Sequence, residues 1–94
     1  MVTHIVFWKL KEENKAANAG CIKESLEALV GVIPGLLEAR VGENVNGGEY
    51  DLALAARFVS MEALEAYDVH PEHQKVRAFV SQVRLERAAV DFFS

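Results

Sequence analysis

The chain has 94 residues, which suits one domain, and 51% of them are hydrophobic, slightly above the usual range of about 45–50%. A domain of this size has too little interior for such an excess, so we expect an apolar surface to contact a second subunit. The net charge of −4, with lysines and arginines scattered along the chain, excludes the clustered basic surface that nucleic-acid binding requires.

Cysteine content and hydropathy indicate a soluble cytoplasmic protein. The single cysteine, Cys21, cannot form an intrachain disulfide, which fits a reducing compartment. The N-terminal segment MVTHIVFWKL lacks the basic start of a signal peptide, and no stretch approaches the roughly 20 apolar residues of a membrane span. We therefore expect no membrane partner and a single domain over residues 1–94.

The first strand and helix are predicted from hydrophobic periodicity. Residues 2–10, VTHIVFWKL, are rich in β-branched and aromatic residues and are apolar on both faces, which predicts a strand covered on both sides. Residues 14–31 predict a helix with Asn14 as its N-cap, ended by Gly31 and Pro34-Gly35. The buried stripe of this helix is expected to consist of Ile22, Leu26, Leu29 and Ile33.

Two further strands form a predicted hairpin. Residues 36–44 and residues 50–58 both alternate, and the second strand carries small alanines on one of its faces. Asn46-Gly47-Gly48 between them tolerates positive φ angles, as a hairpin turn needs. The side chains expected to share one face of the first of these strands are Leu37, Ala39 and Val41.

The second half of the chain predicts two helices and a final strand. Ser60 caps a helix over MEALEAYD, and the His70-Pro71 step interrupts it because a residue before proline avoids the α region. The next helix begins at Pro71, where the missing N–H costs nothing. Residues 86–93, ERAAVDFF, predict the last strand.

The resulting order is βαββαβ, which favours an α+β fold with a four-stranded antiparallel sheet and helices on one face. The other face of such a sheet is bare. We expect this bare face to carry Trp8 and Leu10, and to be covered by the sheet of a second copy related by a two-fold axis. The predicted partner is therefore a second copy of this chain.

The segments HIVFWKLK, IPGL, VGEN, YDLAL, AYDVHPEHQKV and VDFF resemble the stress-responsive A/B barrel family, also called Dabb, over roughly residues 3 to 93. The resemblance implies a ferredoxin-like protomer and a homodimer whose two sheets form a dimeric α/β barrel. One branch of that family cyclises linear polyketides by intramolecular aldol condensation, without metal or cofactor. The catalytic pair of that branch is the tyrosine and second histidine of Y-x-x-H-P-x-H, which match Tyr67 and His73, and a pocket histidine of its first strand matches His4.

The sequence also departs from the cyclising branch in the residues that correspond to its pocket. That branch has aromatic residues where this chain has Ile22, Lys23 and Leu26, and it has a histidine on the third strand where this chain has Leu52. Trp8 replaces a smaller aliphatic residue and is expected to fill part of the cavity, so the lining of the predicted pocket differs from that of the cyclases.

His73 and Tyr67 each allow two interpretations. His73 lies three residues before Val76 on the apolar face of its helix, so its imidazole is expected to point inward. It is either a core histidine bonded to a neighbour or a backbone carbonyl, or a general base of pKa about 6.5 that removes a proton next to a carbonyl. Tyr67 is either a core residue with a wet hydroxyl or a group that holds a carbonyl oxygen as negative charge develops.

The other two histidines are weighed in the same way. His70 precedes the helix start and is either a local cap or a second proton-handling group. His4 faces the same side as Val6 and Trp8, and a buried imidazole there needs a partner: a water, a ligand or His73. The residues that we expect to line the ligand pocket are His4, Val6, Trp8, Leu52, Leu54 and His70.

Three functional hypotheses remain open. The first is a homodimer that binds a small apolar or aromatic carbonyl compound in its barrel, a space that the second copy is needed to enclose. In this hypothesis the protein acts as a cofactor-independent cyclase or lyase through Tyr67 and His73. The second is a non-catalytic, stress-related or structural dimer, and the third is a cofactor-free oxygenase. No metal is expected, because Asp68 and Glu72 flank the histidines without the spacing that places two ligands on one helical face. The resemblance to the cyclising branch implies that no other cofactor is needed.

Overall fold

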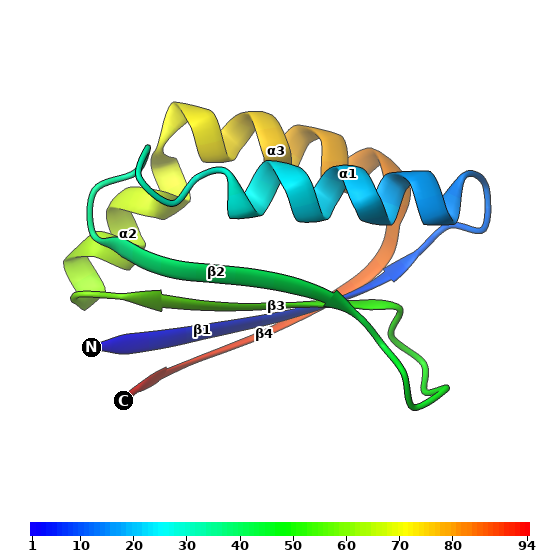
Figure 1. The fold of residues 1–94 in the computed structure, drawn as a ribbon, viewed down its shortest axis with the longest axis horizontal. Helices are drawn as coiled ribbons and strands as arrows, with labels where there is room; N and C mark the ends of the chain where they lie inside the picture. Colours follow the sequence, from blue (N-terminus) through cyan, green and yellow to red (C-terminus); the bar gives the residue numbers. More distant parts are fainter.

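The structure is a computed structural model that describes residues 1–94. Its strands pair antiparallel in the order β2-β3-β1-β4, and the three helices cover one face of this sheet (Figure 1). The predicted ferredoxin-like βαββαβ arrangement is confirmed. The elements in chain order are β1 (Val2–Leu10), α1 (Lys15–Glu27), β2 (Leu36–Glu43), β3 (Leu52–Phe58), α2 (Met61–Val69), α3 (Pro71–Val83) and β4 (Arg84–Phe93).

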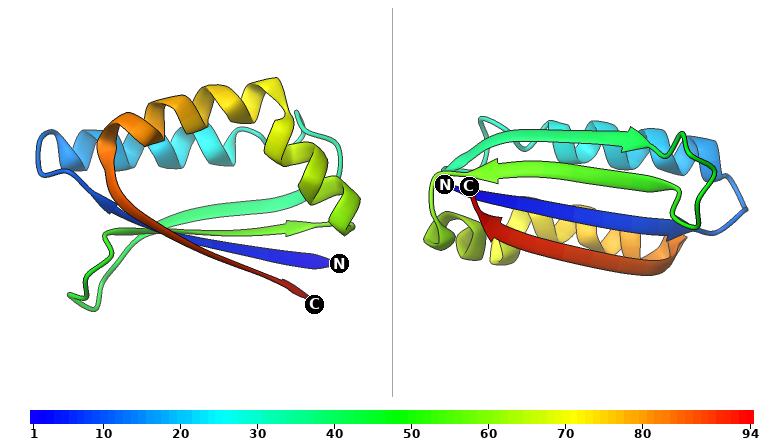
Figure 2. Two further views of the ribbon diagram at one scale, coloured as in Figure 1. Left: turned by 180° about the vertical axis from the view of Figure 1, so that it is seen from behind. Right: turned by 90° about the horizontal axis from the view of Figure 1, so that it is seen from below.

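The two faces of β1 are assigned opposite to the prediction. Trp8 is only 5% exposed and faces the helices, whereas Phe7 is 37% exposed and lies on the open face. Both faces of this strand are apolar, so alternation alone could not decide which one the helices cover. Figure 2 (right) looks onto the open face, where all four strands lie in front of the helices. The bare surface therefore carries Ile5, Phe7, Val90 and Phe92 rather than Trp8 and Leu10.

Several element boundaries differ from the prediction for local reasons. Helix α1 ends at Glu27, and turns continue to Ile33, which stays buried. Asn14 precedes α1 with φ 54° and its side chain makes no capping hydrogen bond. In β2 the register shifts between Leu36 and Glu38, so Leu37 is 46% exposed while Leu36 takes the inward position. Residues 39 and 41 keep the predicted inward direction, and β4 begins at residue 84.

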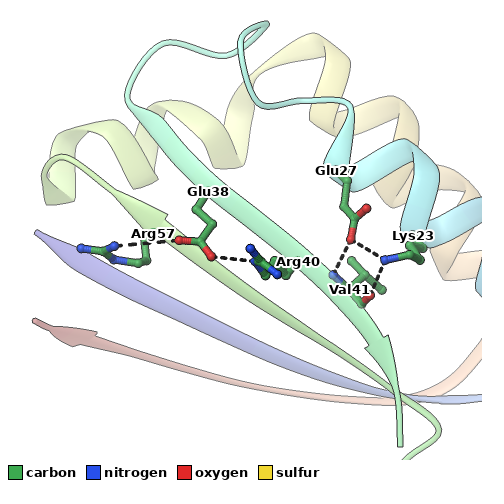
Figure 3. A network of polar contacts seen from close by, with 6 residues as sticks. All are labelled: Lys23, Glu27, Glu38, Arg40, Val41 and Arg57. Atoms are coloured by element: carbon green, nitrogen blue, oxygen red, sulfur yellow. Dashed lines mark hydrogen bonds and ion pairs between the residues drawn. The ribbon is translucent and has the colours of Figure 1, made fainter.

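Helix α1 is attached to β2 by a polar network as well as by its apolar stripe. The Glu27 carboxylate accepts hydrogen bonds from the Val41 N–H at 2.9 Å and from Lys23 Nζ at 2.7 Å (Figure 3). Lys23 also donates to the Val41 carbonyl at 3.0 Å. Lys23 and the Val41 N–H hold the pKa of Glu27 below its usual value, which shows that these contacts favour the ionised carboxylate.

Two caps determine where α2 ends and α3 begins. The Ser60 hydroxyl accepts a hydrogen bond from the Ala63 N–H at 3.2 Å, as predicted for the start of α2. His70 is extended (φ −66°, ψ 134°) before Pro71, and its Nδ1 accepts from the Glu72 N–H at 3.1 Å. The capping interpretation of His70 is thus confirmed. None of the helices is both long and apolar enough to cross a bilayer.

The backbone at Gly35 passes close to α2, and the first prediction concerns this close approach. Gly35 has φ +84°, and a Cβ added there would lie 2.6 Å from the Ala63 Cβ on α2. Gly31 has nearly the same φ, +88°, but nothing within 4 Å of an added Cβ. We expect Gly31→Ala to lower the free energy of unfolding by about 1–2 kcal/mol through backbone strain alone, and Gly35→Ala to lower it clearly more.

Urea unfolding of both variants and the wild type checks this expectation, because the two substitutions share the backbone strain and differ in the contact with α2. Equal losses of stability in the two variants would contradict the role of the close approach.

Candidate functional site

A cavity of about 280 Å³ lies between the helices and the sheet of a single chain. Its location corrects the expectation that a second copy is needed to enclose the pocket. All seven elements except β2 contribute to its wall. The lining residues are His4, Val6, Trp8, Leu26, Leu54, Tyr67, Asp68, His73, Val76, Arg77, Val80, Ser81, Arg84 and Arg87.

The cavity brings together most of the residues that the sequence singled out. His4, Val6, Trp8, Leu54, Tyr67 and His73 all line it, and Trp8 forms part of the wall rather than filling the space. Two predicted lining residues lie elsewhere. His70 is occupied as the cap of α3. Leu52 borders a separate, more open pocket beside the β2–β3 hairpin.

His73 is buried, with 8% of its surface exposed, and its orientation is fixed by one backbone contact. Its Nδ1 lies 3.0 Å from the Tyr67 carbonyl oxygen, which can only accept a hydrogen bond. Nδ1 therefore carries the proton, and Nε2 holds the free electron pair of the neutral ring. Nε2 makes no hydrogen bond, yet no fully buried polar side-chain atom lacks a partner. Nε2 is consequently not fully buried, and His73 lines the cavity.

Tyr67 is 2% exposed, and its ring stacks on that of His73, with centroids 3.8 Å apart and planes 24° apart. Burial raises the pKa of Tyr67 far above its usual value, and the nearby Asp68 carboxylate raises it further. Its hydroxyl is therefore a neutral donor across the physiological range. The hydroxyl forms no hydrogen bond in the chain and is not sealed, so it is free to bond a group in the cavity.

His4 has a partner that the sequence analysis did not consider. Its Nδ1 contacts the Asp91 carboxylate, which faces it directly in the β1–β4 ladder. Its ring also meets the edges of Phe58 and Tyr67, each at a centroid distance of 6.3 Å. Asp91 fixes the orientation of the imidazole at the inner end of the cavity.

The polar residues missed by sequence reasoning are three arginines. Arg77 follows His73 by four residues, so helical spacing placed it near the face of His73, whereas Arg84 is extended and begins β4 directly after α3. Arg87 faces Trp8 across the β1–β4 ladder, a pairing for which the sequence held no local signal. All three line the cavity, although the basic residues had been described as scattered.

The structure contains no group of three or more His, Cys, Asp or Glu side chains arranged to hold a metal ion. Tyr67 and His73 lie together with arginines and apolar side chains. These side chains can hold an organic ligand by hydrogen bonds, apolar contact and positive charge.

Comparison with known proteins identifies the family. Residues 2–94 match the model of the Stress Responsive A/B Barrel Domain, and the chain belongs to this family. The comparison with curated proteins found no match.

Solved structures with a similar fold include three bacterial proteins. A dimeric protein of unknown function with a ferredoxin-like fold from Bacteroides fragilis is 32% identical, with a TM-score of 0.89, over 97% of this chain and 93% of that one. A dimeric ferredoxin-like protein from Jannaschia sp. is 25% identical (TM-score 0.88, 99% and 98% covered). One from Thermobifida fusca is also 25% identical (TM-score 0.84, 97% and 88% covered).

The environment of His73 predicts a pH dependence of stability. Burial lowers the pKa of His73 below the ordinary value of 6.5, so the unfolded ring takes up a proton at a higher pH than the folded ring does. The unfolded state then binds more protons, and the free energy of unfolding falls as the pH drops through 6.5 toward the folded pKa. We expect this loss to be smaller in His73→Gln.

Thermal unfolding of the wild type and His73→Gln between about pH 7.5 and pH 5.5 measures the effect. Gln82→Ala is the matched control, because Gln82 is exposed on α3 and carries no titratable group, so its replacement should leave the pH dependence of the wild type. An identical pH dependence in the wild type and His73→Gln would contradict the burial argument.

Proposed function

We propose that the cavity binds a small carbonyl compound and that His73 removes a proton from the carbon next to the carbonyl. The observation that carries this proposal is the fixed orientation of His73, a cavity-lining residue whose Nδ1 is engaged by the Tyr67 carbonyl while Nε2 has no hydrogen-bond partner. A neutral imidazole with one free nitrogen is a suitable general base at neutral pH. The reaction class is a cofactor-independent, aldol-type cyclisation or cleavage.

The lowered pKa of His73 supports its role as a base. Burial disfavours the imidazolium, and the Arg77 guanidinium acts in the same direction, so the ring is neutral at physiological pH. The Tyr67 ring, stacked on His73 at 3.8 Å, would stabilise the imidazolium once a proton has been taken. The base is thus neutral before the step, and its protonated form has a favourable neighbour after it.

Tyr67 supplies the complementary group for the carbonyl oxygen. When His73 Nε2 takes the proton, the C–H electron pair moves into the carbonyl and leaves negative charge on its oxygen. The Tyr67 hydroxyl, neutral because its pKa is raised, donates a hydrogen bond to that oxygen. The resulting enolate carbon forms a bond to a second carbonyl of the same molecule, and the imidazolium returns its proton to the new alkoxide.

The size and lining of the cavity agree with this type of ligand. A volume of about 280 Å³ is near the lower end, roughly 300 Å³, of small-molecule sites. Val6, Trp8 and Leu54 offer apolar contact for an aromatic or aliphatic part. His4, held by Asp91, adds a further polar group on the sheet side.

The proposal includes a homodimer formed through the open face of the sheet. Phe7 is 37% exposed, Val90 58% and Phe92 49% on this face, which a monomer would leave in water. The 32% identical structure from Bacteroides fragilis is described as dimeric, which supports the same assembly here. The cavity lies between the sheet and the helices, so a dimer formed through the open face would use the opposite side of the sheet.

Proton exchange tests the catalytic pair. With 4-phenyl-2-butanone in D₂O, we expect the wild type to speed up deuterium uptake next to the carbonyl and His73→Ala to fall to the buffer rate. Tyr67→Phe should lower the rate by about 10²-fold, as loss of one donor to a developing oxyanion does. The rate should rise with pH and level off above a midpoint below 6.5, since His73 acts in its neutral form.

Folding is checked separately for these variants. The Tyr67 carbonyl also accepts a hydrogen bond from the His70 N–H at 3.1 Å, so His73→Ala does not leave it unpaired. Lys75→Ala, which removes an exposed charge of α3, is the activity control. Equal exchange rates in the wild type and a folded His73→Ala variant would refute the proposed base.

The mass in solution tests the dimer. Light scattering should give about twice the 10.4 kDa of one chain for the wild type, and a value near one chain for Phe7→Asp, because a carboxylate on the covered face would be desolvated. Val69→Asp is the control, since Val69 is 73% exposed but lies on α2, away from the sheet. A folded wild type whose mass by light scattering is that of one chain would exclude the proposed assembly.

A further inference from the structure

We infer that the ligand of the cavity carries a carboxylate as well as the reacting carbonyl, so that the substrate class is a small keto acid. This inference rests on the proposed function for the carbonyl. The carboxylate part rests on a separate observation, the arginines Arg77, Arg84 and Arg87 that line the cavity.

The three cavity arginines have no carboxylate partner in the chain. The chain has five arginines, and the other two, Arg40 and Arg57, both pair with Glu38, at 2.9 Å and 3.9 Å (Figure 3). No ion pair or side-chain hydrogen bond involves the cavity arginines. The chain has more acidic than basic side chains and a net charge of −4, so carboxylates are plentiful. The arginines that nevertheless lack a carboxylate partner all line the same cavity.

The charge at the cavity therefore opposes that of the whole molecule. Its wall carries three guanidinium groups and only one carboxylate, that of Asp68, while the buried His73 is neutral. A cavity with excess positive charge attracts an anion. The attraction is stronger than that of the same charges fully surrounded by water, because the cavity walls exclude part of the water. Guanidinium groups in particular pair with carboxylates through two parallel hydrogen bonds.

The arginines are placed so that one ligand can reach both them and the reacting pair. Arg77 lies one helical turn beyond His73 on α3, and Arg87 lies opposite Trp8 on β4. The charges of Arg77 and Arg87 act on Tyr67, and Arg77 acts on His73. A bound carboxylate would offset the effect of Arg77 on His73, which makes the imidazole a stronger base in the complex than in the free protein.

Matched ligands test the inference directly. The probes are 2-oxo-4-phenylbutanoate and its carboxamide, which have the same shape and differ in the negative charge. By NMR titration we expect the wild type to bind the acid about tenfold more tightly than the amide, as expected for a charge-assisted pair at a partly exposed site. The preference should disappear in Arg77→Gln/Arg87→Gln and remain in Arg40→Gln, whose arginine pairs with Glu38 away from the cavity.

The substituted arginines are solvent-exposed, so the double variant should fold, which thermal unfolding verifies. Equal affinity of acid and amide in the wild type, a preference that survives in the double variant, or binding of neither compound would overturn the inference. Displacement of the acid by an equal concentration of inorganic phosphate would also overturn it, because the site would then attract any anion.

Proton exchange at C3 of the same two compounds separates this inference from the proposed function. A carboxylate preference without His73-dependent exchange would remove the proposed reaction and leave the carboxylate site in place. His73-dependent exchange of acid and amide at equal rates and with equal affinities would support the base and overturn the keto-acid assignment.

Discussion

The break between α2 and α3 is the constraint on which the candidate site depends. His70 is extended because a proline follows it, and its side chain caps the helix that begins there. This short break turns the chain so that the last turn of α2 and the first turn of α3 meet. Tyr67 and His73, six residues apart, consequently stack on one another, and the carbonyl of the first fixes the ring of the second. Pro71 therefore influences the positions of Tyr67 and His73 through the conformation of the backbone.

The sheet completes the site from below. Strand β1 contributes His4, Val6 and Trp8, which line the cavity. On β4, Asp91 lies opposite His4 and Arg87 lies opposite Trp8. Helix α3 provides most of the helical lining of the cavity, and α1 contributes Leu26. Glu27 and Lys23 bond α1 to β2, the one strand that does not line the cavity (Figure 3).

A feature of the fold could be predicted from the sequence when the residues that determine it are close together in the chain. The Ser60 and His70 caps, the Pro71 helix start and the inward direction of His73 depend on neighbours within a few residues, and the structure has all of them. The covered face of β1 depends on where distant helices pack, and two apolar faces gave no basis for the choice. The partners of His4 and Trp8 depend on the β1–β4 register, which joins residues far apart in the sequence, so Asp91 and Arg87 were not found.

Arg77 is an intermediate case. Its spacing from His73 was visible in the sequence, but a lysine or arginine four residues along a helix is usually a solvated charge, and the pattern does not reveal whether a carboxylate lies near it. Only the fold shows that Arg40 and Arg57 have such a partner and that Arg77 does not. The unpaired state of a charge is a property of the three-dimensional surroundings rather than of local spacing.

The alternation of side chains along β1 has a consequence for how such proteins can diverge. Even-numbered residues of this strand face the helices, and His4, Val6 and Trp8 among them line the cavity, whereas odd-numbered residues such as Ile5 and Phe7 face the open side. A substitution at one position therefore alters one surface and leaves the chemistry of the opposite surface nearly intact, although the two positions are adjacent in the chain. Selection could then remodel the ligand chamber and the assembly contact as two independent traits encoded by the same nine residues.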